Sequence, residues 1–255
     1  MTDAPPAETR IYTAALVIIG DEILSGRTQD ANTAYLAKWL GVQGIRLKEV
    51  RVVADEMDAI AEAVNALRAQ HDYLFTTGGI GPTHDDITVD AIAAALGRDV
   101  IVHPDARAIL ESHYGDQLTD ARLRMARTPD GASLIENPRT KAPGIRVENI
   151  FIMAGVPMIT QGMLAALDGQ LPGGAPVRSR TVAAWTQESK AAEVLRQVER
   201  SNPGVQIGSY PFWREGKTGA NFVMRSTSEA QLAEVAQMLM AQLAEIGITP
   251  IDGEL

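Results

Sequence analysis

The stretch from residue 76 to 86 has the residue types of a phosphate-binding loop: it reads Thr-Thr-Gly-Gly-Ile-Gly-Pro-Thr-His-Asp-Asp. A short apolar run precedes it, and a segment with helical apolar spacing follows at 87–96. Glycines let backbone N–H groups turn towards a ligand, and the start of a helix behind them adds partial positive charge. The candidate phosphate-binding residues are therefore Gly78, Gly79, Gly81 and Thr83.

Acidic side chains occur where the same loop could face them. Asp85 and Asp86 end the glycine-rich stretch, and Asp21 and Glu22 follow the first apolar run. Carboxylates beside a bound phosphate hold Mg²⁺ or another divalent metal ion, so Asp21, Asp85 and Asp86 are candidate metal ligands. Structural roles are the alternative. Acids in the first turn of a helix complement its dipole, Thr83 with Asp86 has the spacing of a capping box, and Asp21-Glu22 alone is better explained as a polar turn.

The elements that must position these residues alternate between strand and helix. Strands are predicted from apolar or β-branched runs at 14–19, 45–53, 73–77, 100–102 and 149–153. The alternation predicts an α/β domain with a mostly parallel sheet covered on both faces. Ligands of such sheets bind at the carboxyl ends of the strands, where the loops beginning at Gly20, Asp55 and Gly78 can converge. We also expect Asp55 to open a helix, and Asp85 and Asp86 to lie in the first turn of the helix 87–96.

A shift in composition divides the chain. Residues 168–176 are rich in glycine and proline, which predicts a linker between a domain at 11–170 and a smaller one at 177–255. The smaller domain is predicted to be α+β. Its expected elements are a strand at 177–185, a helix at 189–198, a hairpin of strands 205–209 and 221–225, and a helix at 228–246.

Composition excludes several functions. The chain has 255 residues, a net charge of −9 and no cysteine. The negative charge argues against a nucleic-acid surface, which needs a basic patch, and favours a metal-bridged anionic ligand. The absence of cysteine excludes disulfides and thiolate chemistry. The longest apolar run, near 14–19, is too short to cross a membrane, and we expect a cytoplasmic protein.

The ordered motifs together resemble the molybdopterin-binding domain family. They are Gly20-Asp21-Glu22-Ile23-Leu24 with Gly26 and Asn32, Asp55, the stretch 77–88, Ala142-Pro143-Gly144 and Gly155-Val156-Pro157. The similarity covers about 14–167. It is to the amino-terminal domain of competence/damage-inducible protein A (CinA) and to the corresponding domain of eukaryotic FAD synthases. The smaller domain is similar to the second domain of CinA-type proteins.

The resemblance implies a three-layer α/β/α domain and gives roles to particular residues. Asp55 and Asp86 match aspartates that support magnesium-dependent chemistry in related adenylyltransferases, which makes them the candidate catalytic residues. The ligand-binding residues implied in the same way are Gly20, Asp21, Glu22, Asn32, Pro143, Gly144, Gly155 and Pro157.

The resemblance to CinA-type proteins implies metal-dependent hydrolysis of a nucleotide-sugar pyrophosphate such as ADP-ribose. The alternatives are molybdopterin binding or adenylation in molybdenum cofactor biosynthesis, and a non-catalytic module that binds a pterin or a nucleotide. Each has a phosphorylated small molecule as its partner, with Mg²⁺ or another divalent metal ion as cofactor in the catalytic cases and molybdopterin as a ligand in the others. By resemblance the protein is also expected to form a homo-oligomer.

Overall fold

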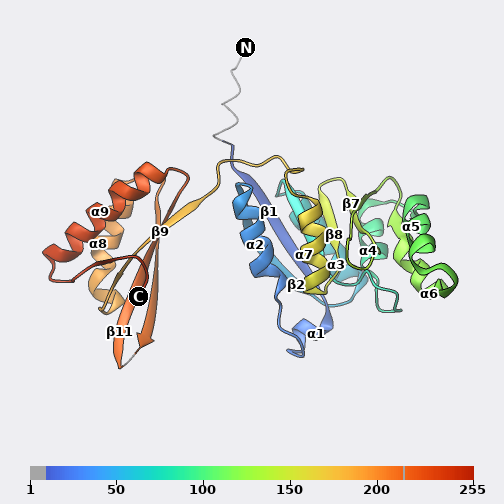
Figure 1. Ribbon diagram of the computed structural model, residues 1–255, viewed down its shortest axis with the longest axis horizontal. Coiled ribbons are helices and arrows are strands. Elements are labelled where there is room, and N and C mark those ends of the chain that lie inside the picture. The colour runs from blue at the N-terminus through green and yellow to red at the C-terminus, as the bar shows by residue number, and fades with distance from the viewer. Residues whose placement is uncertain (1–9, 215) are drawn as a thin grey trace, which may run out of the picture. The chain divides into compact units, whose positions relative to one another are not determined.

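A computed structural model describes residues 10–214 and 216–255, and the chain forms two compact units whose boundary in the sequence lies between Gly174 and Ala175 (Figure 1). The first unit is built on a six-stranded sheet with the order β2-β1-β3-β8-β7-β6. Its first four strands are parallel, and at the other edge β7 pairs antiparallel with β8 and β6 pairs antiparallel with β7. The strands are β1 (Tyr12–Ile19), β2 (Ile45–Val53), β3 (Tyr73–Thr77), β8 (Ile150–Met153), β7 (Gly144–Val147) and β6 (Ser133–Ile135).

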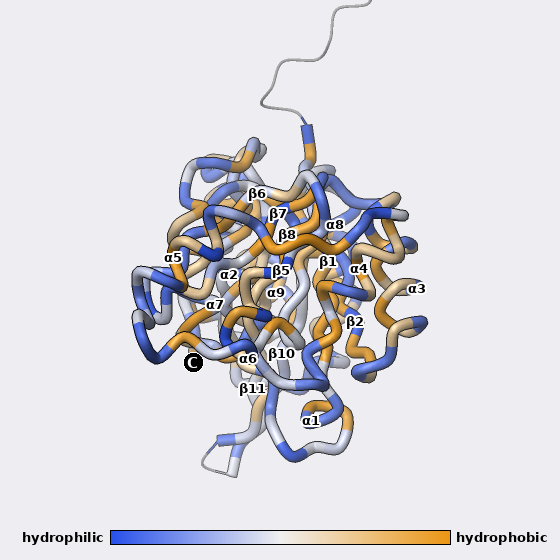
Figure 2. The backbone as a smooth tube through the Cα atoms, turned by 90° about the vertical axis from the view of Figure 1, so that its right-hand side faces the viewer, coloured by the Kyte–Doolittle hydropathy of each residue, from blue (hydrophilic) through white to orange (hydrophobic). Residues whose placement is uncertain are grey.

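Helices cover both faces of this sheet because alternate strand residues point to opposite sides. In β1, Ala14, Leu16 and Ile18 pack in one apolar cluster with side chains of α2 (Asn32–Val42) and α7 (Pro157–Ala166). The intervening β1 residues pack on the other side with α3 (Met57–Arg68) and α4 (Thr88–Leu96). Figure 2 shows β1 and β8 coloured as hydrophobic. The predicted three-layer α/β/α fold with a mostly parallel sheet is confirmed.

The residues between α4 and β6 in the sequence form a small subdomain, which we call the satellite. It contains β4 (Val100–Val102), α5 (Pro104–Tyr114), the 3₁₀ turn η2 (Gly115–Gln117), α6 (Asp120–Leu123), the 3₁₀ turn η3 (Arg124–Ala126) and β5 (Arg127–Pro129). The alternating pattern placed 100–102 with the parallel strands, and this was wrong. β4 instead pairs antiparallel with β5. Arg127 binds the carboxylate of Asp90 on α4 from two of its nitrogens, which fastens the satellite to the domain.

Two helix starts also differ from expectation. The helix after β2 begins at Met57, because the Asp55 carboxylate accepts the backbone N–H of Asp21 instead of capping the helix. The helix after β3 begins at Thr88, so Asp85 and Asp86 lie in the loop before it. Neither acid is in a first helical turn, and the explanation by the helix dipole therefore does not apply to them.

The second unit has the order β10-β11-β9-β12, and its elements follow one another as β-α-β-β-α-β. They are β9 (Arg178–Ala184), α8 (Glu188–Ser201), β10 (Gln206–Arg214), β11 (Lys217–Ser226), α9 (Glu229–Glu245) and β12 (Ile251–Asp252). The predicted hairpin is present as β10 and β11. The two helices bury one face of the sheet around Val182, Phe222 and Met224. In the part of the chain that the structure describes, no helix is long and apolar enough to cross a membrane.

The carboxyl ends of β1, β3 and β8 come together at Gly78. This residue has a φ of +105°, and a Cβ on it would lie 2.1 Å from the carbonyl oxygen of Ile19. Its N–H donates to the carbonyl oxygen of Met153 at 3.1 Å, and a Cβ on Gly155 would lie 3.3 Å from its Cα. Only glycine therefore lets these three chain segments pack at their present separation.

We expect Gly78→Ala to lower the free energy of unfolding by at least about 1–3 kcal/mol, because the added methyl group meets backbone and the φ is unfavourable for alanine. Gly41→Ala is the matched control. Gly41 lies inside α2, and a Cβ there has no heavy atom within 4 Å, so that variant should be unchanged or slightly more stable. Urea unfolding followed by circular dichroism compares the two. Equal stabilities would contradict the close approach at Gly78.

Candidate functional site

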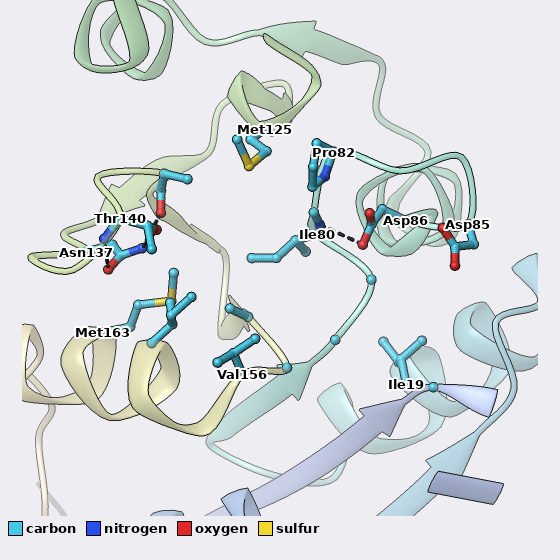
Figure 3. A pocket seen from close by; sticks show the side chains of 18 of the residues that line it. Ile19, Ile80, Pro82, Asp85, Asp86, Met125, Asn137, Thr140, Val156 and Met163 are labelled. Atoms are coloured by element: carbon cyan, nitrogen blue, oxygen red, sulfur yellow. Dashed lines mark hydrogen bonds between the residues drawn. The ribbon is translucent and has the colours of Figure 1, made fainter. Parts of the chain in front are cut away.

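A cavity of about 620 Å³ lies at the carboxyl ends of β1, β2, β3 and β8. Six segments line it: the loops after β1, β2 and β3, the start of α7, the satellite, and the loop before β7. Figure 3 shows Ile80, Met125, Val156 and Met163 projecting into the space between Asn137 and Thr140 on one side and Asp85 and Asp86 on the other. The cavity thus has an apolar middle, with hydroxyl and amide groups on one side and carboxylates on the other.

Of the glycines predicted to hold phosphate, all three line this cavity, but the structure gives each a packing role as well. A Cβ on Gly79, whose φ is +66°, would lie 2.2 Å from Oγ1 of Thr88. The carbonyl oxygen of Gly79 accepts the N–H of Thr88, and that residue's hydroxyl donates to the carbonyl oxygen of Gly78. Within the described chain, the N–H groups of Gly79 and Ile80 donate to no other residue. These two are the donors left for a ligand, and phosphate binding stays a prediction.

Asp86 holds the loop together with both of its carboxylate oxygens. Oδ1 accepts the N–H of Gly81 at 2.7 Å, and Oδ2 accepts the N–H of Thr83 at 2.7 Å and also the Thr83 hydroxyl. The N–H of Gly81 is therefore not free for a phosphate. A change at Asp86 would disturb the loop together with any chemistry, so it cannot by itself test the predicted catalytic role.

Asp55 is the acid whose environment is most unusual. Burial raises its pKa above the ordinary value of 3.8, and the charges of Asp21, Glu22 and Asp85 raise it further, against the lowering effect of the Asp21 N–H. Asp55, Glu22 and Asp85 all line the cavity. A carboxyl with a raised pKa beside other acids is typical of a site that takes up a proton or a cation.

The predicted metal ligands do not form a ready-made metal site. Among the described residues, no group of three acids or histidines has a geometry that could hold a metal ion. The carboxylates that face the cavity still suit Mg²⁺, which is commonly held by one or two protein carboxylates together with phosphate oxygens of the substrate. A metal ion at this place remains a prediction.

The structure brings most of the predicted site residues to the cavity wall. Those that line it are Gly20, Glu22, Asp55, Gly78, Gly79, Gly81, Asp85, Asp86, Pro143, Gly155 and Pro157. Four others are not part of the wall: Asp21, Asn32, Thr83 and Gly144.

Each of these four has a structural contact instead. The Asp21 backbone holds Asp55, and Thr83 holds Asp86. Asn32 is buried, and its Nδ2 donates to the carbonyl oxygen of Gly155 at 2.8 Å, which fixes the segment before α7. Gly144 is packed in β7, where a Cβ would lie 3.1 Å from the Ile152 carbonyl oxygen. These contacts position the loops that form the wall, and direct contact of these four residues with a ligand stays a prediction.

Sequence reasoning missed one whole wall of the cavity, which consists of Tyr114, Arg122 and Met125 from the satellite and Asn137 and Thr140 before β7. Tyr114 ends the helix α5, Arg122 and Met125 lie in elements of only three or four residues, and no motif marks any of them. Asn137 has a signal of its own: its Oδ1 accepts the N–H groups of the two residues at 139 and 140, while its Nδ2 donates to Thr140 and Ala142. Such hydrogen bonds are typical of an asparagine that directly precedes a turn.

This fold and cavity define a class of protein: an α/β/α domain with a cavity at the carboxyl ends of its parallel strands, where folds of this kind bind their ligands. Residues 15–171 match the family model described as a probable molybdopterin binding domain. The chain belongs to the molybdopterin-binding domain family. Residues 176–252 match the model described as the middle domain of FAD synthase. The predicted resemblance is confirmed.

Relatives cover both units. A protein of Aeropyrum pernix is 34% identical over 210 residues, which are 78% of this chain and 78% of that protein. A CinA-like protein of Gemmatimonas aurantiaca is 32% identical over 246 residues, which are 88% of this chain but 56% of that protein. The crystal structure of the protein CinA, of unknown function, from Thermoplasma acidophilum is 34% identical, with a TM-score of 0.58, over 62% of this chain and 98% of that one.

We expect the environment of Asp55 to be visible in the pH dependence of stability. Because its pKa is higher in the folded protein, the stability it contributes is fully present below about pH 4 and is lost as the pH rises through the folded pKa. Asp55→Asn retains an oxygen for the Asp21 N–H and does not ionise. The variant should therefore gain stability relative to the wild type between pH 3 and pH 7. Urea midpoints measured across this range test it, and a constant difference would contradict the raised pKa.

Proposed function

We propose that the cavity binds a phosphorylated heteroaromatic small molecule, a pterin of the molybdopterin type or a related nucleotide. The observation that carries the proposal is the composition of the wall: an apolar middle flanked by the glycine loop and by carboxylates, within one cavity of about 620 Å³. That volume lies in the range of sites for small ligands and cofactors. Membership of the molybdopterin-binding domain family supports the choice of ligand class.

The apolar middle suits a flat ring. Ile80, Met125, Val156 and Met163 face the same space in Figure 3, and methionine sulfur makes favourable contacts with aromatic rings. The free N–H groups of Gly79 and Ile80 at the loop are the matching donors for a phosphate oxygen.

The binding proposal predicts that Val156→Trp blocks the cavity. Val156 lines the cavity, and 56% of it is exposed, so a larger side chain can enter the space without disturbing the core. We expect binding of neopterin 3′-phosphate or AMP, measured by isothermal titration calorimetry, to weaken at least about tenfold.

Val42→Trp is the matched control, because Val42 is 78% exposed at the end of α2 and is not part of the wall. Its binding should equal that of the wild type. A wild-type protein that binds neither ligand would overturn the proposed function, and so would unchanged binding by Val156→Trp.

Hydrolysis of a nucleotide-sugar pyrophosphate is the second candidate, and the raised pKa of Asp55 favours it. In this reaction water attacks one phosphorus of ADP-ribose, a new P–O bond forms, the bridging P–O bond breaks, and AMP and ribose 5-phosphate leave. Asp55 would take the proton of the attacking water, a role that suits a carboxyl with a raised pKa. Glu22 and Asp85 would supply oxygens to a divalent metal ion, which when bound offsets negative charge on the phosphates.

If the protein is this hydrolase, Asp55→Asn should lower AMP release from ADP-ribose by about 100-fold or more, because general-base catalysis contributes about 10²–10⁴-fold. Asp58→Asn is the control, since Asp58 lies in the first turn of α3 outside the cavity wall. Release is measured by chromatography with magnesium, manganese or cobalt. Ligand binding by the wild type without AMP release would leave binding, or adenylation of a pterin by ATP, as the function.

A further inference from the structure

Arg122 stands apart from the rest of the cavity wall. Of the described residues that line the cavity, it alone carries a positive charge, whereas Glu22, Asp55, Asp85 and Asp86 are acidic. It is on α6, in the satellite that packs around Ala106 and Leu110. It therefore reaches the cavity from a different part of the fold than the acids, which follow β1, β2 and β3.

The side chain of Arg122 is held in place on two sides. Its guanidinium lies 4.4 Å from the ring centroid of Tyr114, and its Nη1 donates to the carbonyl oxygen of Gln117 at 2.5 Å. Tyr114 also lines the cavity. A guanidinium has five N–H groups, so one bond to Gln117 leaves most of them for a ligand. A preorganised guanidinium loses less conformational entropy when it binds an anion than a mobile side chain does.

The negative charge of the cavity makes the guanidinium of Arg122 important for binding an anionic ligand. Four acids repel an anionic ligand, and the N–H groups of Gly79 and Ile80 are neutral donors. A phosphate needs a counter-charge, and the forked guanidinium matches two phosphate oxygens at once.

We propose that Arg122, held against Tyr114, binds a phosphate of the ligand and makes the cavity select phosphorylated ligands over the same rings without phosphate. This assignment rests on the proposed function. It makes Arg122 a specificity-determining residue of the site and gives the satellite a role in ligand choice.

The experiment compares each phosphorylated ligand with its parent ring compound: AMP with adenosine, and neopterin 3′-phosphate with neopterin. Isothermal titration calorimetry is done on the full chain for the wild type, Arg122→Ala and Arg122→Lys. We expect Arg122→Ala to bind the phosphorylated ligand about 10- to 100-fold more weakly, with the affinity for the parent compound unchanged. Arg122→Lys should recover part of the loss, because it keeps the charge but not the fork. Salt should weaken binding less in Arg122→Ala than in the wild type.

Two further variants separate this role from a structural one. Arg107→Ala removes an arginine of α5 that pairs with Glu111 away from the cavity wall, and it should bind like the wild type. Tyr114→Phe keeps the ring under the guanidinium and should keep selectivity, whereas Tyr114→Leu should lose part of it. An equal loss for phosphorylated and parent compounds in Arg122→Ala, or no loss for either, would overturn the proposal while leaving the proposed function intact. A wild type that binds neither compound of either pair would overturn the proposed function itself.

Discussion

The close approach of three chain segments at Gly78 is the constraint on which the cavity depends. The end of β1 contributes the carbonyl of Ile19, the end of β8 contributes Met153, and Gly155 follows on the way to α7. Because no side chain separates them, the loops after these strands leave the sheet together and can enclose one space. Asn32 of α2 and Thr160 of α7 add hydrogen bonds to the carbonyls at Gly155 and Ala154, so both helices on that face fix the same junction.

The hydrogen bonds of this junction occupy many of the polar groups of the loop residues. Asp86 accepts from Gly81 and Thr83, and Thr88 bonds to both Gly78 and Gly79. Buried or constrained backbone groups must be paired, so a loop of this shape needs such bonds whether or not a ligand is present. The groups left for chemistry are therefore fewer than the motif suggests: two backbone N–H groups, the acids around Asp55, and the guanidinium of the satellite.

The charges of the cavity wall determine which ligands the cavity can bind. The chain carries a net charge of −9, and the wall concentrates carboxylates where a phosphate would lie. Burial is the main cause of the raised pKa of Asp55, and the neighbouring carboxylates add to it because each negative charge makes the ionised form less favourable. An anionic ligand is compatible with such a wall only with a cation beside it, either a bound metal ion or the arginine that the satellite supplies.

The sequence by itself determined the four parallel strands of the first unit, most of the longer helices and the glycine loop, because apolar periodicity and glycine positions are local properties. It also placed Gly20, Asp55 and Gly78 at one edge of the sheet, which follows from parallel alternation. It did not reveal the short strands β5, β6, β7 and β12. Only the tertiary structure decided that β4 leaves the main sheet, that Asp86 is a loop clamp, and that Tyr114 and Arg122 reach the cavity. The pairing of β4 and the position of the satellite side chains depend on contacts between residues distant in sequence, which no local pattern reveals. The bonds of Asp86 are local, but residue types alone do not show which polar groups of a loop pair with each other.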